Sequence, residues 1–171
     1  MVITPIVNDG RINRSKTTLN KIVAATISLL RKNNNGQIPT AQEIAVKSGV
    51  GIRTVFRHID DMEGLIEEVN RRYLNDLESY IAKNNPKQNS KDHRIEHVIK
   101  ERFYLYNTYQ HVFNLTITSL NNSSAIRTGF IKFNHILRQR FEDLIPEIKM
   151  INKDKQNLID TLISYAAWFL S

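Results

Sequence analysis

Three side chains in the middle of the chain have the residue types and spacing of a metal-dependent hydrolase. His93, Glu96 and His97 spell H-x-x-E-H, a spacing that places two imidazoles on one helix face to hold zinc, beside a carboxylate that can act as a base. The sequence offers no identifiable third ligand, and the surrounding segment is rich in lysine and arginine. Such short matches often arise by chance on solvated helices. A metallohydrolase using these residues is therefore only an alternative, and we expect no metal or cofactor.

Two arginines indicate a different chemistry, the binding of a polyanion. Arg53 and Arg57 are four residues apart, which puts both guanidinium groups on one face of a predicted short helix over residues 52–58. Residues 1–60 contain nine Lys and Arg against three Asp and Glu, so they carry +6 of the chain's net charge of +7. A positive field concentrated in one part of the chain attracts a polyanion. Charge alone fits a solvated basic surface equally well.

Other enzyme classes lack their residues in this sequence. The chain has no cysteine, which excludes disulfides, thiolate metal sites and cysteine nucleophiles. It has no glycine-rich phosphate loop, no G-x-S-x-G turn and no convincing nucleophile triad, so we expect no enzyme activity. No apolar run approaches the length of about 20 residues that crosses a bilayer, and the N-terminus lacks a signal-peptide pattern. We therefore expect a cytoplasmic protein with no membrane partner.

The elements that position these side chains are predicted to be helices throughout. Glycine and proline number only six and four, and apolar residues recur at helical spacing along almost the whole chain. The expected fold is all-α, with an N-terminal three-helix domain followed by a C-terminal helical bundle. We expect a flexible tail over 1–10, a DNA-binding type of domain over 11–60, a connecting helix over 61–83, a loop over 84–91 and a C-terminal domain over 92–171. The expected helices cover about 15–32, 41–47, 52–58, 61–83, 92–110, 111–120, 124–145 and 153–171.

Residues 40–59 have the packing pattern of a helix-turn-helix. Thr40 followed three residues later by Glu43 forms a capping box that starts a helix. Gly49 can adopt the left-handed conformation that a tight turn between two helices needs, and the small Ala45 lets the helices cross closely. The apolar positions that this arrangement would bury are Ile44, Val50, Val55 and Ile59.

Burial of those positions leaves a cationic outer face on the second helix. A recognition helix enters the major groove of DNA with its first residues at the base edges, where Arg53 could donate two hydrogen bonds to guanine O6 and N7. Arg57 and His58 would then meet phosphates, and Gly51 would let backbone amides approach a phosphate closely. The residues expected to be exposed are Arg53, Thr54, Arg57 and His58.

The segment T-A-Q-E-I-A-V-K-S-G-V-G-I-R-T-V-F-R-H-I-D-D-M-E-G-L-I, with the preceding I-V-A-A-T-I-S-L-L, resembles the DNA-binding region of the tetracycline-repressor (TetR) family. The resemblance covers about residues 15–70, and the remainder matches only as a generic helical bundle. It implies that Thr40 and Gln42 meet the DNA backbone or groove edge. It also implies base reading by Ile52, Arg53 and Thr54, and backbone contacts by Phe56, Arg57 and His58.

Two positions depart from the family pattern. The family usually has tyrosine where Phe56 stands, so a phosphate-bonding hydroxyl is missing. It usually has lysine where Met62 stands, which puts a second phosphate contact in doubt. Arg57 and the basic residues of the first helix could compensate for both.

The C-terminal part contains a set of aromatic residues that fits either a core or the lining of an apolar ligand pocket between helices. The candidates for a pocket are Phe103, Tyr106, Phe113 and Phe133. Family resemblance implies a small-molecule effector there, and a homodimer on a palindromic double-stranded DNA operator. Two recognition helices about one DNA turn apart multiply the few contacts of one, and we expect 124–145 and 153–171 to supply the dimer faces.

Together these features predict a sequence-specific DNA-binding transcriptional regulator, and they favour a repressor over an activator. The first alternative is a helical interaction module whose basic end binds a protein or a membrane surface, without specific DNA binding. The second is the metallohydrolase of His93, Glu96 and His97.

Overall fold

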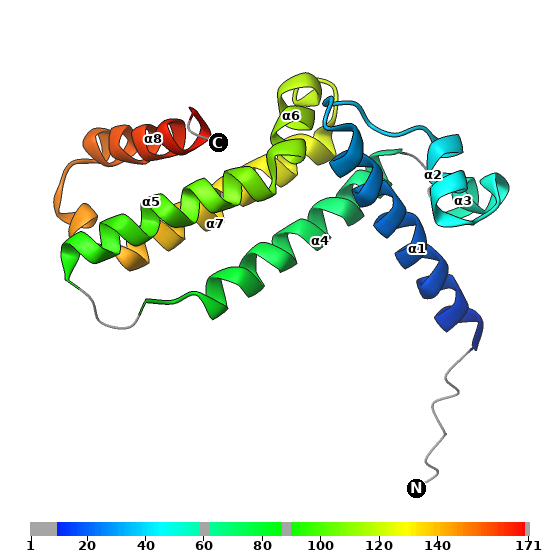
Figure 1. Ribbon diagram of the computed structural model, residues 1–171, viewed down its shortest axis with the longest axis horizontal. Helices are drawn as coiled ribbons and strands as arrows, with labels where there is room; N and C mark the ends of the chain where they lie inside the picture. The colour runs from blue at the N-terminus through cyan, green and yellow to red at the C-terminus, as the bar shows by residue number, and fades with distance from the viewer. Residues whose placement is uncertain (1–9, 59–61, 87–89, 170–171) are drawn as a thin grey trace, which may run out of the picture.

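The computed structural model describes residues 10–58, 62–86 and 90–169, and every regular element in these ranges is helical (Figure 1). The expected all-α class is confirmed. A short pair, α2 and α3, lies at one end of the molecule, and η1 lies at the opposite end (Figure 1). The elements in chain order are α1 (Gly10–Asn33), α2 (Ala41–Ser48), α3 (Ile52–His58), α4 (Met62–Lys83), α5 (Lys91–Thr108), α6 (Gln110–Ser119), α7 (Ser124–Leu144), the 3-10 helix η1 (Pro146–Met150) and α8 (Lys153–Phe169).

Two boundaries differ from the sequence-based expectation. Helix α1 begins at Gly10 rather than near Ser15. The sequence did not predict this start, because residues 12–17 are exposed and show no apolar periodicity. The tail expected over 1–10 otherwise lies outside the described residues. The η1 turn after α7 was not expected; Pro146 opens it, since proline has the right φ for a first helical position but cannot continue α7.

One apolar core runs from the N-terminal helices into the C-terminal ones. Among the described residues, each of the helices α1 to α7 contributes side chains to it, so no gap in the core separates the first three helices from those that follow. The expected division into domains stays a prediction. The largest side chains that are almost completely buried in this core are Ile22, Ile44, Val55, Leu65, Ile66, Val69, Leu77, Leu105 and Leu137.

The end of the bundle that lies away from α2 and α3 is stabilised by buried charges as well as by a second apolar cluster. Arg140 of α7 is buried and pairs with buried Glu101 of α5, with Nη2 and Oε2 3.1 Å apart. The same guanidinium donates to the carbonyl of Asn84 at 2.8 Å, which ties down the segment after α4. Arg102 donates to the carbonyl of Leu137. A buried ion pair contributes little net stability but is costly to break, so these bonds specify how α5 and α7 pair.

Helices α4 and α7 approach closely at Gly129. A Cβ atom at that position would lie 2.5 Å from Asn70 Nδ2, and this amide donates to the carbonyl of Ala125 at 2.8 Å. The start of α4 is bound to the start of α7 as well. Glu63 accepts hydrogen bonds from the hydroxyl of Ser124 at 2.8 Å and from the amide of Ala125 at 2.9 Å. The hydroxyl of Ser123, followed by the amide of Ala125 and the hydroxyl of Ser124, holds the pKa of the Glu63 carboxyl below its usual range.

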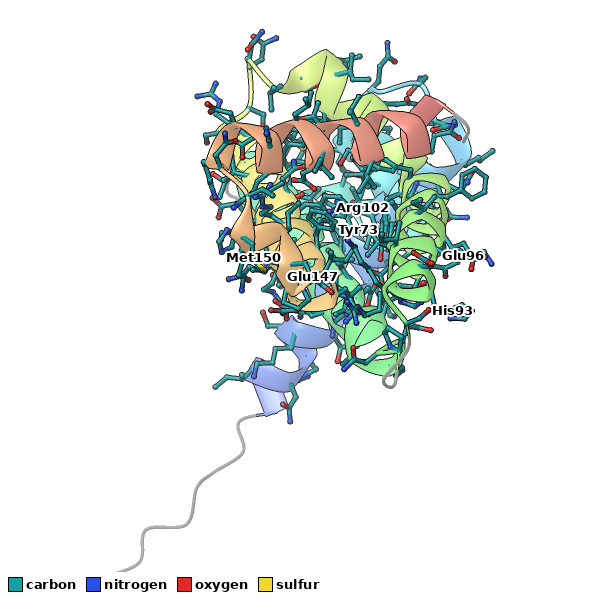
Figure 2. The ribbon with its side chains drawn as sticks, turned by 90° about the vertical axis from the view of Figure 1, so that its left-hand side faces the viewer. Tyr73, His93, Glu96, Arg102, Glu147 and Met150 are labelled. Carbon is teal, nitrogen blue, oxygen red and sulfur yellow. The ribbon has the colours of Figure 1, made fainter. Side chains whose placement is uncertain are left out.

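Helices α1, α4 and α6 meet at a buried polar pair. Tyr73 of α4 and His111 of α6 lie 2.8 Å apart, hydroxyl to Nε2, with Tyr73 inside the helical body (Figure 2). Burial, and then the charge of Arg31, lowers the pKa of His111 to about 4. The imidazole is therefore neutral, and its tautomer decides which member of the pair donates.

The loop after α1 is also fastened to α6. Asn114 donates from Nδ2 to the carbonyl of Asn34 at 3.1 Å, and the hydroxyl of Thr118 donates to the carbonyl of Gly36. Gly36 has a φ of +70°, and a Cβ there would lie 2.7 Å from the carbonyl oxygen of Asn114. Only glycine fits this approach.

We predict that Gly129→Ala and Asn70→Ala are strongly coupled. The new methyl group displaces the Asn70 amide and removes its bond to Ala125, a cost that outweighs the gain of up to about 1 kcal/mol in helix propensity. In the Asn70→Ala background the same substitution meets no amide and should be neutral or stabilising. Urea unfolding of the four proteins measures this coupling; additive effects would contradict it.

We predict that His111 makes stability fall as the solution becomes acidic. His111 binds a proton near pH 6.5 in the unfolded chain but only near pH 4 in the folded chain. Its contribution to the free energy of unfolding is therefore fully present above about pH 6.5 and is lost as the pH falls toward 4. At pH 5 the loss is about 2 kcal/mol relative to pH 7.5. Urea unfolding at both pH values should show a smaller difference for His111→Gln, which keeps an acceptor for Tyr73. If the free energy of unfolding changed equally with pH in the two proteins, the pH dependence would not come from His111.

Candidate nucleic-acid interface

Helix α2 starts with the capping box expected from the sequence. Thr40 has φ −70° and ψ 156°, and its Oγ1 accepts from the amide of Glu43 at 3.3 Å. The carboxylate of Glu43 accepts in return from the amide of Thr40 at 2.8 Å. These bonds lower the pKa of the Glu43 carboxyl. They satisfy amides that a helix start otherwise leaves without partners, which matters because an eight-residue helix cannot form alone.

The turn between α2 and α3 is formed as predicted at Gly49. This residue ends α2 with φ +67° and ψ 19°, a left-handed conformation that glycine adopts without cost. The carbonyl of Gly51 then accepts from the amides of Thr54 at 2.8 Å and Val55 at 3.1 Å, which starts α3. No atom lies within 4 Å of where a Cβ of Gly51 would stand, so the backbone there is open to an approaching group.

The inner sides of α2 and α3 are buried as expected. Ile44, Ala45 and Val55 are almost completely buried, and half-buried Val50 packs against the same core. Because each short helix has so few core positions, these side chains fix which faces turn outward. The expected burial of Ile59 falls outside the described residues.

The outer face of α3 differs in part from the expectation. Arg53 and Arg57 are exposed, whereas Thr54 and His58 are half-buried. The helix also exposes two large apolar side chains, Ile52 and Phe56. On α2 and its cap, Thr40 and Gln42 are exposed as predicted. Seven of the nine candidate residues are thus exposed, and they are Thr40, Gln42, Gly51, Ile52, Arg53, Phe56 and Arg57.

The positive charges of this surface are not neutralised by the described part of the chain. Within residues 10–58, 62–86 and 90–169, no carboxylate lies within 4 Å of the guanidinium of Arg53 or Arg57. Lys16 and Lys21 of α1 and Lys47 of α2 are exposed too. An unpaired cationic face attracts a polyanion more strongly than a helix with mixed charge does.

Sequence reasoning missed two features of this end of the molecule. Met62, where the resembling family usually has lysine, is half-buried and packs against the core; it secures the start of α4. Glu63 caps α7 through Ser124 and Ala125. Neither the burial of Met62 nor the capping by Glu63 could be found without the fold. Glu63 and the start of α7 are separated by some sixty residues.

The four aromatic candidates for an effector pocket fall into two groups. Tyr106, Phe113 and Phe133 pack on one another, with ring centroids 4.5 Å apart for the first two and 5.5 Å for the last two, whereas Phe103 is exposed. Two hollows of about 920 Å³ between α4 and α7 and about 360 Å³ between α1 and α4 are not lined by any of the four. The effector pocket stays a prediction.

The H-x-x-E-H residues on α5 do not converge. His93 and Glu96 lie at the outer edge of the molecule (Figure 2), where Glu96 pairs with Lys100 at 2.7 Å and the Nδ1 of His93 lies 2.9 Å from the hydroxyl of Ser90. His97 lies 3.4 Å from Glu101 instead. Among the described residues, no group of three or more His, Asp or Glu could hold a metal ion.

Comparisons with known proteins add no family to these observations. No protein-family model matches the chain, and no curated protein matches it. Over the described residues, none of the helices is both long and apolar enough to cross a membrane.

We predict that Thr40→Ala lowers the free energy of unfolding by about 1 kcal/mol, because the amide of Glu43 loses its acceptor. Thr40→Ser keeps a hydroxyl at the same place and should leave stability close to that of the unmodified protein. Urea unfolding measures both. Equal stability of the alanine and serine variants would show that the cap contributes nothing.

Proposed function

We propose that the chain is a sequence-specific DNA-binding transcriptional regulator with a TetR-like arrangement, acting as a homodimer on a palindromic operator. The observation that carries the proposal is the α2–α3 pair. Its inner side is locked into the core by Ile44, Ala45 and Val55, and its outer side presents Arg53 and Arg57 without a described carboxylate partner. This is the arrangement that a helix-turn-helix requires.

The contacts follow from the order of residues along α3. Arg53 is near the start of the helix, where side chains reach base edges, and its fork of donors matches guanine O6 and N7. Arg57 is one turn further on and suits a phosphate. Thr40 and Gln42 at the start of α2 suit the backbone or groove edge. Thr54 and His58, being half-buried, have less freedom to reach DNA and serve as secondary contacts.

The core shared by α3 and α4 supports regulation. Val55 of α3 and Leu65 of α4 lie in the same apolar core, and α4 is bound to α7 through Glu63 and Asn70. A ligand or second copy that binds one arrangement of α7 better than another would therefore change the position of α3, by as much as its differential affinity allows. Leu158 and Leu162, four residues apart on α8, are both more than half exposed and offer an apolar stripe to a second copy.

Selection of bound sequences from a random pool of duplex DNA tests the proposal. A palindromic consensus is the expected result, because two copies related by a twofold axis read two half-sites. The competing function is a helical module whose basic end binds proteins, with only weak, sequence-independent DNA binding. An unenriched pool would favour that module and overturn the regulator.

We predict that Arg53→Ala and Arg57→Ala weaken DNA binding in different ways. Loss of Arg53 should cost about 1–3 kcal/mol on the selected site and relax specificity at one position. Loss of Arg57 should weaken binding equally on all sequences and reduce the salt slope by about one, because one fewer counterion is released. Binding isotherms at several salt concentrations measure both effects, with Lys155→Ala on α8 as the control that removes a distant charge. Identical behaviour of the two arginine variants would contradict these roles.

A further inference from the structure

Helix α3 has an apolar stripe beside its cationic stripe. The side chain of Phe56 is 61% exposed and that of Ile52 is 40% exposed, and because they are four residues apart they lie on one helix face. Arg53 and Arg57 each follow one of them directly in sequence, so the two stripes run side by side. A seven-residue helix thus exposes two large hydrophobic side chains next to two exposed arginines, neither of which has a carboxylate partner among the described residues.

In the part of the chain that the structure describes, the apolar core does not pack over these two side chains. The core contact of α3 is made by Val55, which is completely buried. Phe56 does not belong to the core or to the side chains packed against it, and neither does Ile52. The phenyl ring of Phe56 has no donor or acceptor, so it cannot bond a phosphate as a tyrosine would.

The floor of the major groove offers one kind of apolar group, the C5-methyl of thymine. A helix that brings Arg53 to a guanine edge brings the neighbouring stripe to the adjacent base pairs. Apolar side chains there gain by covering methyl groups and gain little from a cytosine or a guanine edge. The positive stripe supplies the attraction and the apolar stripe supplies discrimination.

We propose that Ile52 and Phe56 read thymine methyl groups in the major groove, so that each half-site carries thymine beside the guanine contacted by Arg53. This inference rests on the proposed function. It adds the chemical class of base that the apolar stripe recognises and two specificity-determining residues.

The test replaces thymines of the selected operator one at a time by deoxyuridine, which keeps base pairing and removes only the methyl group. Fluorescence anisotropy then gives the dissociation constant of the full-length protein for each duplex. At one or two positions in each half-site we expect binding about fourfold weaker, the factor that corresponds to the burial of one methyl-sized group. Substitution in both half-sites should weaken binding about sixteenfold, since the two contacts are independent.

Variants assign the effect to particular side chains. Phe56→Ala and Ile52→Ala should bind the thymine duplex more weakly and lose the penalty for uracil at the position each one covers. Phe56→Tyr keeps the ring and should keep the penalty. Ile117→Ala is the matched control, because Ile117 is 69% exposed on α6, a helix without lysine or arginine; it should leave every value unchanged.

The outcomes separate this inference from the proposed function. Enrichment of a palindrome in which uracil binds as well as thymine, or which lacks thymine beside guanine, overturns the methyl contact and leaves the regulator intact. No enrichment at all overturns both. The comparison of thymine with uracil uses the unmodified protein, so its result does not depend on whether any variant folds. Circular dichroism in the helical region checks the folding of each variant.

Discussion

The close approach of α4 to α7 is the constraint on which the rest of the molecule depends. Gly129 has no Cβ, and the space this leaves is filled by the amide of Asn70, which donates to the carbonyl of Ala125. At the same end, Glu63 caps α7. Helix α4 is thereby held along its first turns by a helix some sixty residues away. Because α4 shares its apolar core with Ile44 of α2 and Val55 of α3, the position of α4 bears on that of the candidate DNA-binding surface.

The α2–α3 pair illustrates how little local stability such a surface needs. Helices of eight and seven residues do not persist alone. Here a capping box and a left-handed glycine satisfy the ends of α2, and three buried side chains attach the pair to the core that it shares with α1 and α4. Most of the other side chains of the pair are exposed. Because so few buried side chains hold the pair in place, a short segment can expose charged and apolar stripes together without an apolar core of its own.

The far end of the bundle is organised by polar bonds rather than by a larger apolar core. Arg140 joins α7 to Glu101 and to the segment after α4, while Arg102 joins α5 to the carbonyl of Leu137 and to Asp160 of α8. Such bonds have directional requirements that methyl groups lack, so they constrain how α5, α7 and α8 pack on one another.

The sequence by itself determined the local features of this protein. The helical class, the Thr40–Glu43 cap, the turn at Gly49 and the buried sides of α2 and α3 all follow from residue type and spacing over a few positions, and the structure confirms them. The apolar stripe expected on α8 is not buried at Leu158 and Leu162. Only the tertiary structure decided which side chains of α3 are free, because the half-burial of Thr54 and His58 and the exposure of Ile52 and Phe56 depend on what lies beneath. The same holds for the pairing of Tyr73 with His111 and for the capping of α7 by Glu63. These contacts join residues far apart in the chain, and no periodicity within one helix encodes which distant helix will meet it.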